Sequence, residues 1–370
     1  MSKTFYFDYN ASAPLSPEAK QAIIDSLDDF GNPSSLHAPG TRARQKIELA
    51  RALVVASINA QSEQLLFTSG GTEANNLVLA AFPSALISAT SHHNALHHLS
   101  RDGFQAIPVD QNGYLDLTFL AQELANHQPT LVSFELANNE TGVVQDATKI
   151  ISLAKKYGAL VHIDAVQAYG KLPLDVAALG ADFLTISGHK IGAPMGVGAL
   201  YIKDPKLTHN QLAPRGNPTP NYLGIIGFGA ASTKIPTLVK QQAALKPLLD
   251  HLKTRIESEI SASSVNGSPD LPNTLNVSLP HAEGESIVLA LSERGIAVST
   301  GSACASSSAS NPSHVLLATG KGREVAHSSI RISFGPNTTK SDLDHLLTEL
   351  KSVVTYLRSF STRAKGAKNV

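Results

Sequence analysis

Residues 181–202 read ADFLTISGHKIGAPMGVGALYI and contain two apolar runs separated by a turn rich in glycine and proline. The runs ADFLTIS and GVGALYI have the length and composition of buried β-strands. Only about nine residues separate them, which is too few for the crossover that parallel pairing requires. The sequence therefore predicts two antiparallel neighbouring strands, with Lys190 in the turn directly after the first strand.

Lys190 has two interpretations at this stage. Most lysines in loops are solvated surface residues. A lysine confined at a strand end near other positive charge can instead keep a partly neutral amine, which attack on a cofactor aldehyde requires. The residue alone does not separate these alternatives, so the motifs around it must.

Short apolar runs alternate with helical stretches before this hairpin. We expect strands in QLLFT, SALISAT, QAIPVD, TLVSFEL and ALVHIDA. Nearly continuous apolar strands separated by helices predict a mainly parallel sheet that helices cover on both faces. Ligands bind such sheets beyond the carboxyl ends of the strands. Polar residues follow those ends here: His93, Asn138, Asn139, Asp164, Gln167 and Lys190.

The spacing of Asp164 and Lys190 gives a sharper expectation. Asp164 ends ALVHIDA, and Lys190 follows 26 positions later (190 minus 164). A right-handed crossover of that length places both residues at the same edge of adjacent strands. Pyridoxal phosphate bound to a lysine needs a carboxylate at its pyridinium nitrogen, and an aspartate in this position would supply it. The alternative is a helix-capping aspartate and a solvated lysine.

The run FTSGGTEANN predicts a strand that turns directly into a helix, with Thr72 as the N-cap and Glu73 in the first turn. A glycine-bearing turn at a helix N-terminus presents free backbone N–H groups that suit a phosphate. An ordinary capped helix after a tight turn fits the same pattern.

The C-terminal part of the chain is organised differently. Residues 203–229 are rich in proline and asparagine and are expected to be extended, and a helical region follows from about residue 230 to 260. Strand and helix patterns then alternate from NTLNVSLP to SDLDHLLTELKSVVTYL, which predicts a small α+β domain. We expect an N-terminal arm at 1–13, a large domain at 14–245 and a small domain at 246–370.

Two residues of the predicted small domain are candidates for chemistry. Cys304 lies in STGSACASSSASNPSHVL, a run of small residues after a strand. A lone cysteine is usually inert packing, but a small-residue loop favours an accessible thiol that could act as a nucleophile. Arg331, on the apolar strand SSIRISFG, is either a structural ion-pair arginine or a bidentate clamp for a substrate carboxylate.

Composition argues against several classes of protein. Thirty lysines and arginines balance thirty aspartates and glutamates, so no broad basic surface for nucleic acid is implied. No apolar run approaches the length of a membrane span and no signal-like segment is visible, so we expect a cytoplasmic protein without a membrane partner. The single cysteine excludes an intrachain disulfide.

The motifs together resemble the cysteine desulfurases, pyridoxal-phosphate enzymes of the class V aminotransferase group. The resemblance runs nearly end to end, in family order, through YFDYNASAPLSPEA, GNPSSLH, FTSGGTEANN, ANNETGVVQ, HIDAVQAYGKLPLDV, SGHKIGAPMGVGALY, NTLNVS, GIAVSTGSAC, PSHVL and SSIRISFG. It implies the type I fold of these enzymes: an α/β large domain with a mainly parallel seven-stranded sheet, plus a smaller α+β domain.

The resemblance also implies residue roles. Lys190 is similar to the Schiff-base lysine, Asp164 to the partner of the pyridine nitrogen, and His93 to the stacked imidazole and acid/base. Cofactor-binding residues implied in this way are Gly71, Thr72, Ser187 and His189 on the phosphate side, Gln167 and Asn139 near the ring hydroxyl, and Thr219, which would reach the phosphate of a partner subunit. Arg331, with Asn139, is similar to the substrate-binding residues, and Cys304 to the persulfide-forming cysteine of the long-loop subgroup.

The implied activity converts L-cysteine to L-alanine in a homodimer. Sulfur would pass to Cys304 as a persulfide and then to an acceptor protein, an iron–sulfur scaffold or a thiolation enzyme. The chain departs from the family pattern in the short NQLAPRGNPTP segment and at His92, where the family often has glutamate. One alternative is therefore a class V lyase or aminotransferase, including one like selenocysteine lyase, that forms no persulfide. Another is a non-catalytic relative that binds cofactor poorly, which the retained residues argue against.

Overall fold

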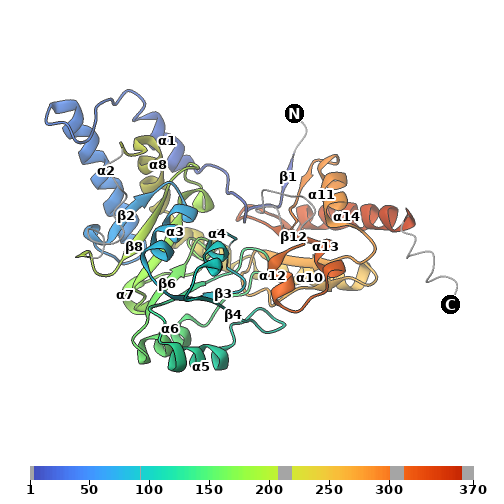
Figure 1. The fold of residues 1–370 in the computed structure, drawn as a ribbon. Helices are drawn as coiled ribbons and strands as arrows, with labels where there is room; N and C mark the ends of the chain where they lie inside the picture. The colour runs from blue at the N-terminus through green and yellow to red at the C-terminus, as the bar shows by residue number, and fades with distance from the viewer. Residues whose placement is uncertain (1–3, 92, 207–218, 301–311, 361–370) are drawn as a thin grey trace.

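The computed structural model describes residues 4–91, 93–206, 219–300 and 312–360 of the 370-residue chain, with the backbone alone at 93 and 94. A larger lobe is built around a seven-stranded sheet, and a smaller lobe lies next to the C-terminus (Figure 1). The strand order in the large sheet is β2 (Leu65–Thr68), β8 (Gly198–Ile202), β7 (Phe183–Ser187), β6 (Leu160–Asp164), β5 (Leu131–Glu135), β3 (Ala85–Ser88) and β4 (Phe104–Ile107).

The sheet is mainly parallel, as the sequence predicts. Strands β7, β6, β5, β3 and β4 are parallel neighbours, and β8 alone runs antiparallel, to β7 on one side and β2 on the other. The predicted hairpin of 181–202 is therefore confirmed. Strands β5, β7 and β8 are buried along their whole length, which explains why their sequences are continuous apolar runs rather than alternating ones.

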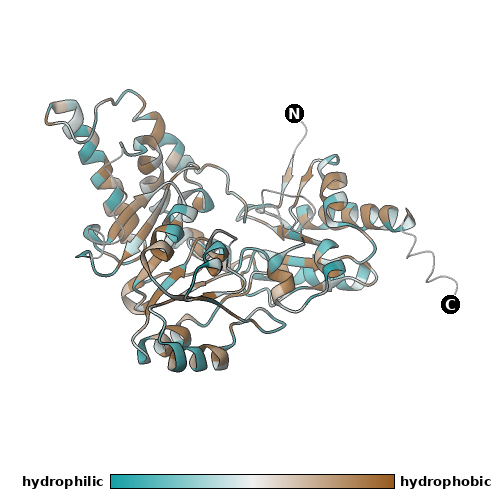
Figure 2. Cartoon of the chain, viewed as in Figure 1, coloured by the Kyte–Doolittle hydropathy of each residue, from teal (hydrophilic) through white to brown (hydrophobic). Residues whose placement is uncertain are grey.

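Helices flank this sheet, and its strands are hydrophobic, whereas α5 (Leu117–His127) and α6 (Ala147–Lys156) at the margin carry hydrophilic surface (Figure 2). The helical elements of this part of the chain are α2 (Ala38–Ala56), η1 (Ser62–Gln64), α3 (Gly71–Ala81), α4 (His93–Leu96), η2 (His97–Ser100), α5 (Leu117–His127), α6 (Ala147–Lys156), α7 (Val176–Leu179) and η3 (Gly188–Ile191).

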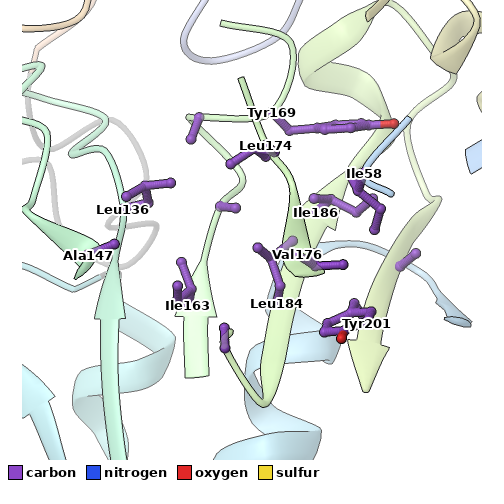
Figure 3. Packing of buried hydrophobic residues seen from close by; sticks show 14 of the residues in the cluster. Ile58, Leu136, Ala147, Ile163, Tyr169, Leu174, Val176, Leu184, Ile186 and Tyr201 are labelled. Carbon is purple, nitrogen blue, oxygen red and sulfur yellow. The ribbon is translucent and has the colours of Figure 1, made fainter. Parts of the chain in front are cut away.

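Tyr169 anchors the core of the large lobe near the hairpin (Figure 3). Its ring is fully buried, and its hydroxyl hydrogen-bonds to Ser57 Oγ at 2.7 Å and to Ser232 Oγ at 3.0 Å. A buried hydroxyl with two partners carries no desolvation penalty from unmade hydrogen bonds. Tyr169 therefore fixes the crossover after β6 relative to α2 and to the helix that contains Ser232.

The segment expected to be extended is partly helical. The residues after Asn221 form α8 (Tyr222–Ser232), and the Asn221 side chain caps it by accepting the Gly224 N–H at 3.1 Å. A Cβ on Gly229 would lie 2.6 Å from Ala50 Cα, so this glycine lets α8 pack closely on α2. The prediction of an extended segment was wrong for residues 222–229, because the glycines there allow close helix packing and do not form a loop.

The helical region expected from about 230 to 260 is divided into three helices. The end of α8 is followed by α9 (Ile235–Ala243) and α10 (Lys246–Glu259). Pro236 and Pro247 each lie in the first turn of these helices, where proline is tolerated, and proline cannot continue a preceding helix.

The smaller lobe has its own hydrophobic core, centred on Phe334, Ile332 and the inner face of the last helix. Its antiparallel sheet has the order β12 (Ser329–Ser333), β10 (Thr274–Ser278) and β9 (Ser264–Val265). The helices are α11 (Gly284–Ser292), α12 (His314–Ala318), α13 (Arg323–His327) and α14 (Lys340–Phe360).

The N-terminal segment crosses between the lobes. Strand β1 (Phe5–Tyr6) pairs in parallel with β11 (Ile296–Ala297) of the smaller lobe. The chain then reaches α1 (Pro17–Ile24), which has proline in its first turn and is capped by the Ser16 side chain, which accepts the Ala19 N–H. Among the described residues, no helix combines the length and apolar character that a bilayer span needs.

Candidate active site

A cavity of about 230 Å³ lies beyond the carboxyl ends of the central strands, next to the N-terminal segment. Eight predicted site residues line it together: Gly71, Thr72, Asn139, Asp164, Gln167, Ser187, His189 and Lys190. Four polar lining residues that sequence analysis did not assign to the site are Asn10, Asn75, Thr90 and Glu135. Of the polar residues predicted to gather at this edge of the sheet, Asn139, Asp164, Gln167 and Lys190 line the cavity, whereas Asn138 does not.

Lys190 enters the cavity from the short helical turn η3 that follows β7. Its Nζ donates to the backbone oxygens of Asn10 at 2.5 Å and Ala11 at 2.9 Å. The solvated alternative does not describe this lysine, because it is half-buried and is bound to the N-terminal segment.

Asp164 ends β6, the strand that pairs with β7. Its carboxylate accepts Asn75 Nδ2–H at 2.7 Å and the Val166 N–H at 2.9 Å. Asn75 Oδ1 is buried without a hydrogen-bond partner. Asp164 and Lys190 thus follow adjacent parallel strands, as their spacing predicts.

Helix α3 begins at the cavity wall, but its cap differs from the prediction. The N-cap is Gly70, not Thr72, and the Glu73 carboxylate accepts the Ser69 N–H at 2.6 Å. The helix starts earlier than expected because glycine permits the turn and Glu73 satisfies the preceding N–H. A Cβ on Gly71 would lie 2.7 Å from Val166 Cγ2, so only glycine fits where the helix meets the turn after β6.

His189 adds a neutral imidazole to the same wall. Its Nδ1 lies 3.3 Å from Ser12 Oγ. Burial, together with the nearby Lys190, lowers the pKa of His189 to about 4. The ring can therefore hydrogen-bond to an anion near neutral pH but adds no positive charge.

Arg331 lies beside the cavity on β12 rather than in its lining. Its side chain is only 1% exposed, and its Nη2 forms an ion pair with Asp8 Oδ1 at 2.7 Å. Its Nη1 donates to Asn139 O at 3.2 Å, whereas its Nε is buried without a partner. These contacts agree with the interpretation of Arg331 as a structural ion-pair arginine. Its Nε–H is a donor that a ligand could use.

Besides Arg331, three further predicted site residues are not among the described residues that line the cavity. Thr219 is exposed and lines a separate cavity of about 530 Å³ with Pro220 and Asn221. The backbone of His93 opens α4 directly after β3, but its side chain lies outside the described residues. Cys304 also lies outside the described residues.

Sequence reasoning missed Glu135 and Asn10. Glu135 ends β5, is buried, and accepts hydrogen bonds from Thr90 Oγ1 and from Ser91 Oγ, the latter at 2.9 Å. A charged residue inside the apolar run TLVSFEL was the available signal. Asn10 depends on contacts with residues far along the chain, which no local pattern reveals.

This architecture, with a lysine and an aspartate at the ends of adjacent strands, is the type I fold of pyridoxal-phosphate-dependent enzymes. Residues 5–346 match the family model described as aminotransferase class-V, and the chain belongs to this family.

Named relatives give closer comparisons. The chain is 40% identical to the cysteine desulfurase IscS of Dictyoglomus turgidum, over 98% of this chain and 97% of the relative. It is 37% identical to cysteine desulfurase IscS 1 of Archaeoglobus fulgidus, over 96% and 98%. The X-ray structure of a NifS-like protein from Rickettsia africae superimposes with a TM-score of 0.86 at 32% identity, over 95% of this chain and 99% of that one.

Proposed function

We propose that the protein is a cysteine desulfurase that uses pyridoxal phosphate to convert L-cysteine to L-alanine and transfers the sulfur to Cys304. The single observation that carries the proposal is the meeting of Lys190 and Asp164 in one cavity at the ends of β7 and β6. Near full-length similarity to proteins named cysteine desulfurase supports the choice of substrate. A related structure, SspA in complex with cysteine, is 28% identical with a TM-score of 0.76 over 91% of this chain and 100% of that one.

The cavity residues fit this cofactor. The N-terminus of the 11-residue helix α3 faces the cavity through Gly71 and Thr72 and would hold the phosphate with Ser187 and neutral His189. The side chain of Asn75 has a buried oxygen without a partner and donates to Asp164. Asp164 would hold the proton on the ring nitrogen.

When bound, pyridoxal phosphate supplies an aldehyde that captures amines and a ring that stabilises negative charge on the substrate α-carbon. Lys190 would hold the aldehyde and then move the α-proton, and Asn139 and Gln167 would lie at the ring hydroxyl. Arg331 would bind the substrate carboxylate, its free Nε–H adding a donor to the site. His93 would act as acid or base.

Sulfur transfer completes the proposed reaction. The Cys304 thiolate attacks the substrate sulfur, an S–S bond forms, and the C–S bond electron pair stays with the substrate carbon. Protonation of that carbon gives alanine, and Cys304 carries the persulfide to an acceptor protein of iron–sulfur cluster assembly or thiolation.

The test is alanine production from L-cysteine with a thiol reductant, for wild type beside Cys304→Ala. Alanine from wild type alone supports the proposal. Equal alanine from both proteins would favour a class V lyase that forms no persulfide. If neither protein produces alanine although the cofactor is bound, the substrate must be a compound other than L-cysteine.

We also propose a homodimer. Large apolar side chains are exposed around α1, α2 and the turn between them: Leu27 at 60%, Phe30 at 75%, Leu36 at 91% and Leu49 at 63%. Met195, in the turn before β8, is 71% exposed. A second copy is the occupant that the family resemblance implies, and exposed apolar side chains of this density are typical of subunit interfaces.

A further inference from the structure

Lys171 is a buried lysine directly behind the cavity wall. It follows Gly170 in the crossover after β6 and is 5% exposed. Its Nζ donates to two amide oxygens, Gln167 Oε1 at 2.8 Å and Asn10 Oδ1. Burying an amine is costly unless it is fully hydrogen-bonded, so its position requires explanation.

The charges around Lys171 are mostly positive. Burial, then Lys190, then Arg331 lower the pKa of Lys171 well below its usual value. Arg331 is itself paired with Asp8. Two amide oxygens accept from this amine, so two of its N–H bonds are used within the protein.

These contacts fix the orientation of the Gln167 amide. Its Oε1 is directed to Lys171, and its Nε2 donates to Asn10 O at 2.9 Å. Within the described part of the chain, the second N–H of Nε2 has no protein acceptor, and the Gln167 side chain lines the cavity. The amide therefore offers the cavity a donor.

The same amine fixes the Asn10 amide. Asn10 Oδ1 accepts from Lys171, which directs Nδ2 to Asn139 O at 3.0 Å and Thr274 Oγ1 at 2.9 Å. The backbone oxygen of Asn10 also accepts from Lys190. Two amides and the reactive lysine are thus held by one network centred on Lys171 and Asn10.

We propose that Lys171 is a positioning residue that makes Gln167 present an N–H donor, rather than a carbonyl oxygen, to the ligand in the cavity. The proposal rests on the proposed function in one respect: the ligand is taken to be an aromatic aldehyde with an ionisable ring hydroxyl. A donor at that hydroxyl favours its ionised form, whereas a carbonyl oxygen would favour the protonated form. Lys171 would thereby set the ionisation of the cofactor without touching it.

The experiment uses the protein reconstituted with pyridoxal phosphate and the variant Lys171→Met, which removes the donor and keeps an unbranched apolar side chain one atom shorter. We expect the dissociation constant of the cofactor to rise about tenfold, because one charge-assisted hydrogen bond is lost. We expect the pH midpoint of the bound cofactor's visible absorbance to move to higher pH. Lys240→Met, at an exposed position on α9, should change neither quantity.

A double-mutant cycle shows whether Lys171 acts through Gln167. In a Gln167→Ala background, Lys171→Met should move the midpoint no further, because the donor is already lost. Lys171→Gln, which keeps two N–H donors, should restore most of the wild-type midpoint. Lys171→Leu repeats the measurement if Lys171→Met does not fold.

An unchanged midpoint in Lys171→Met, or equal shifts with and without Gln167, would overturn the inference. Wild-type protein that gains no visible absorbance with pyridoxal phosphate would instead contradict the proposed function. The two failures are therefore distinguishable.

Discussion

Glu135 and Asp164 are register partners at the ends of the parallel strands β5 and β6, so two carboxyl groups meet at one wall of the cavity. Their environments differ. Asp164 accepts from two N–H donors, whereas Glu135 accepts from Thr90 and Ser91 hydroxyl groups on the turn after β3 and, at 3.5 Å, from Asn138 Nδ2–H. Burial raises the pKa of Glu135, and the nearby Asp164 adds to the shift.

This difference predicts a pH effect on stability. A carboxyl group whose pKa is raised in the folded state stabilises the protein below its unfolded pKa, and this contribution is lost as pH rises through the folded pKa. Glu135→Gln keeps the shape of the side chain but removes the group that titrates. The melting temperature of the variant minus that of wild type should therefore be about 1–3 °C larger at pH 8 than at pH 5. Parallel melting curves across this range would contradict the expectation.

Lys190→Ala should remove the covalent attachment of pyridoxal phosphate and lower desulfurase activity by at least about 100-fold. Borohydride reduction followed by mass spectrometry of the peptide that contains residue 190 measures the attachment. Lys240→Ala is the matched control on an exposed helix position. A reduced cofactor adduct on another lysine of wild type would refute the assignment.

Asp8→Asn should destabilise the protein because it leaves the Arg331 guanidinium, 1% exposed, without its ion partner. Breaking a buried pair costs about 3–5 kcal/mol, and the partial exposure of Asp8 places this case near the lower limit. Asp250→Asn removes an exposed i,i+4 partner of Lys246 and should cost less than about 1 kcal/mol. Urea unfolding of both variants measures the contrast, and similar losses would disprove it.

Gly71→Ala should weaken cofactor binding and lower stability by about 1–3 kcal/mol, since the added Cβ would lie 2.7 Å from Val166 Cγ2. Removing that methyl group with Val166→Ala should restore part of the loss. Thermal melts and cofactor titrations of the two single variants and the double variant test this. Additive losses in the double variant would show that the clash is not with Val166.

Leu36→Asp should shift the protein toward monomer, because a charge in an apolar interface is not compensated. Sedimentation velocity at several concentrations measures the change. Leu289→Asp on α11, 68% exposed in the smaller lobe, is the matched control and should leave the mass unchanged. A monomeric wild type would exclude the proposed dimer.

Much of the large lobe was predictable because its signals are local. Continuous apolar runs gave the buried strands, and the short spacing between ADFLTIS and GVGALYI gave the antiparallel hairpin. The right-handed crossover then placed Asp164 and Lys190 on adjacent strands. These inferences need only periodicity, length and handedness.

The errors have a different origin. Gly229 is indistinguishable in sequence from a loop glycine, and only its contact with Ala50 explains a helix there. The amide network of Asn10 and Lys171 joins residues 161 positions apart, so no window of sequence contains it. Long-range polar contacts of this kind follow from the assembled fold and not from any segment.

The contact between Asn10 and Ser333 has a consequence for synthesis of the chain. The Asn10 N–H donates to Ser333 Oγ at 3.0 Å across a separation of 323 residues. At a translation rate of about 5–20 residues per second, roughly 15–65 s pass before the ribosome delivers this partner. All strands of the large sheet have been synthesised by then. The carbonyl groups of Asn10 and Ala11, which accept from Lys190, are not yet fixed by the contact with Ser333. We therefore expect nascent chains to become competent for cofactor capture only as translation nears its end.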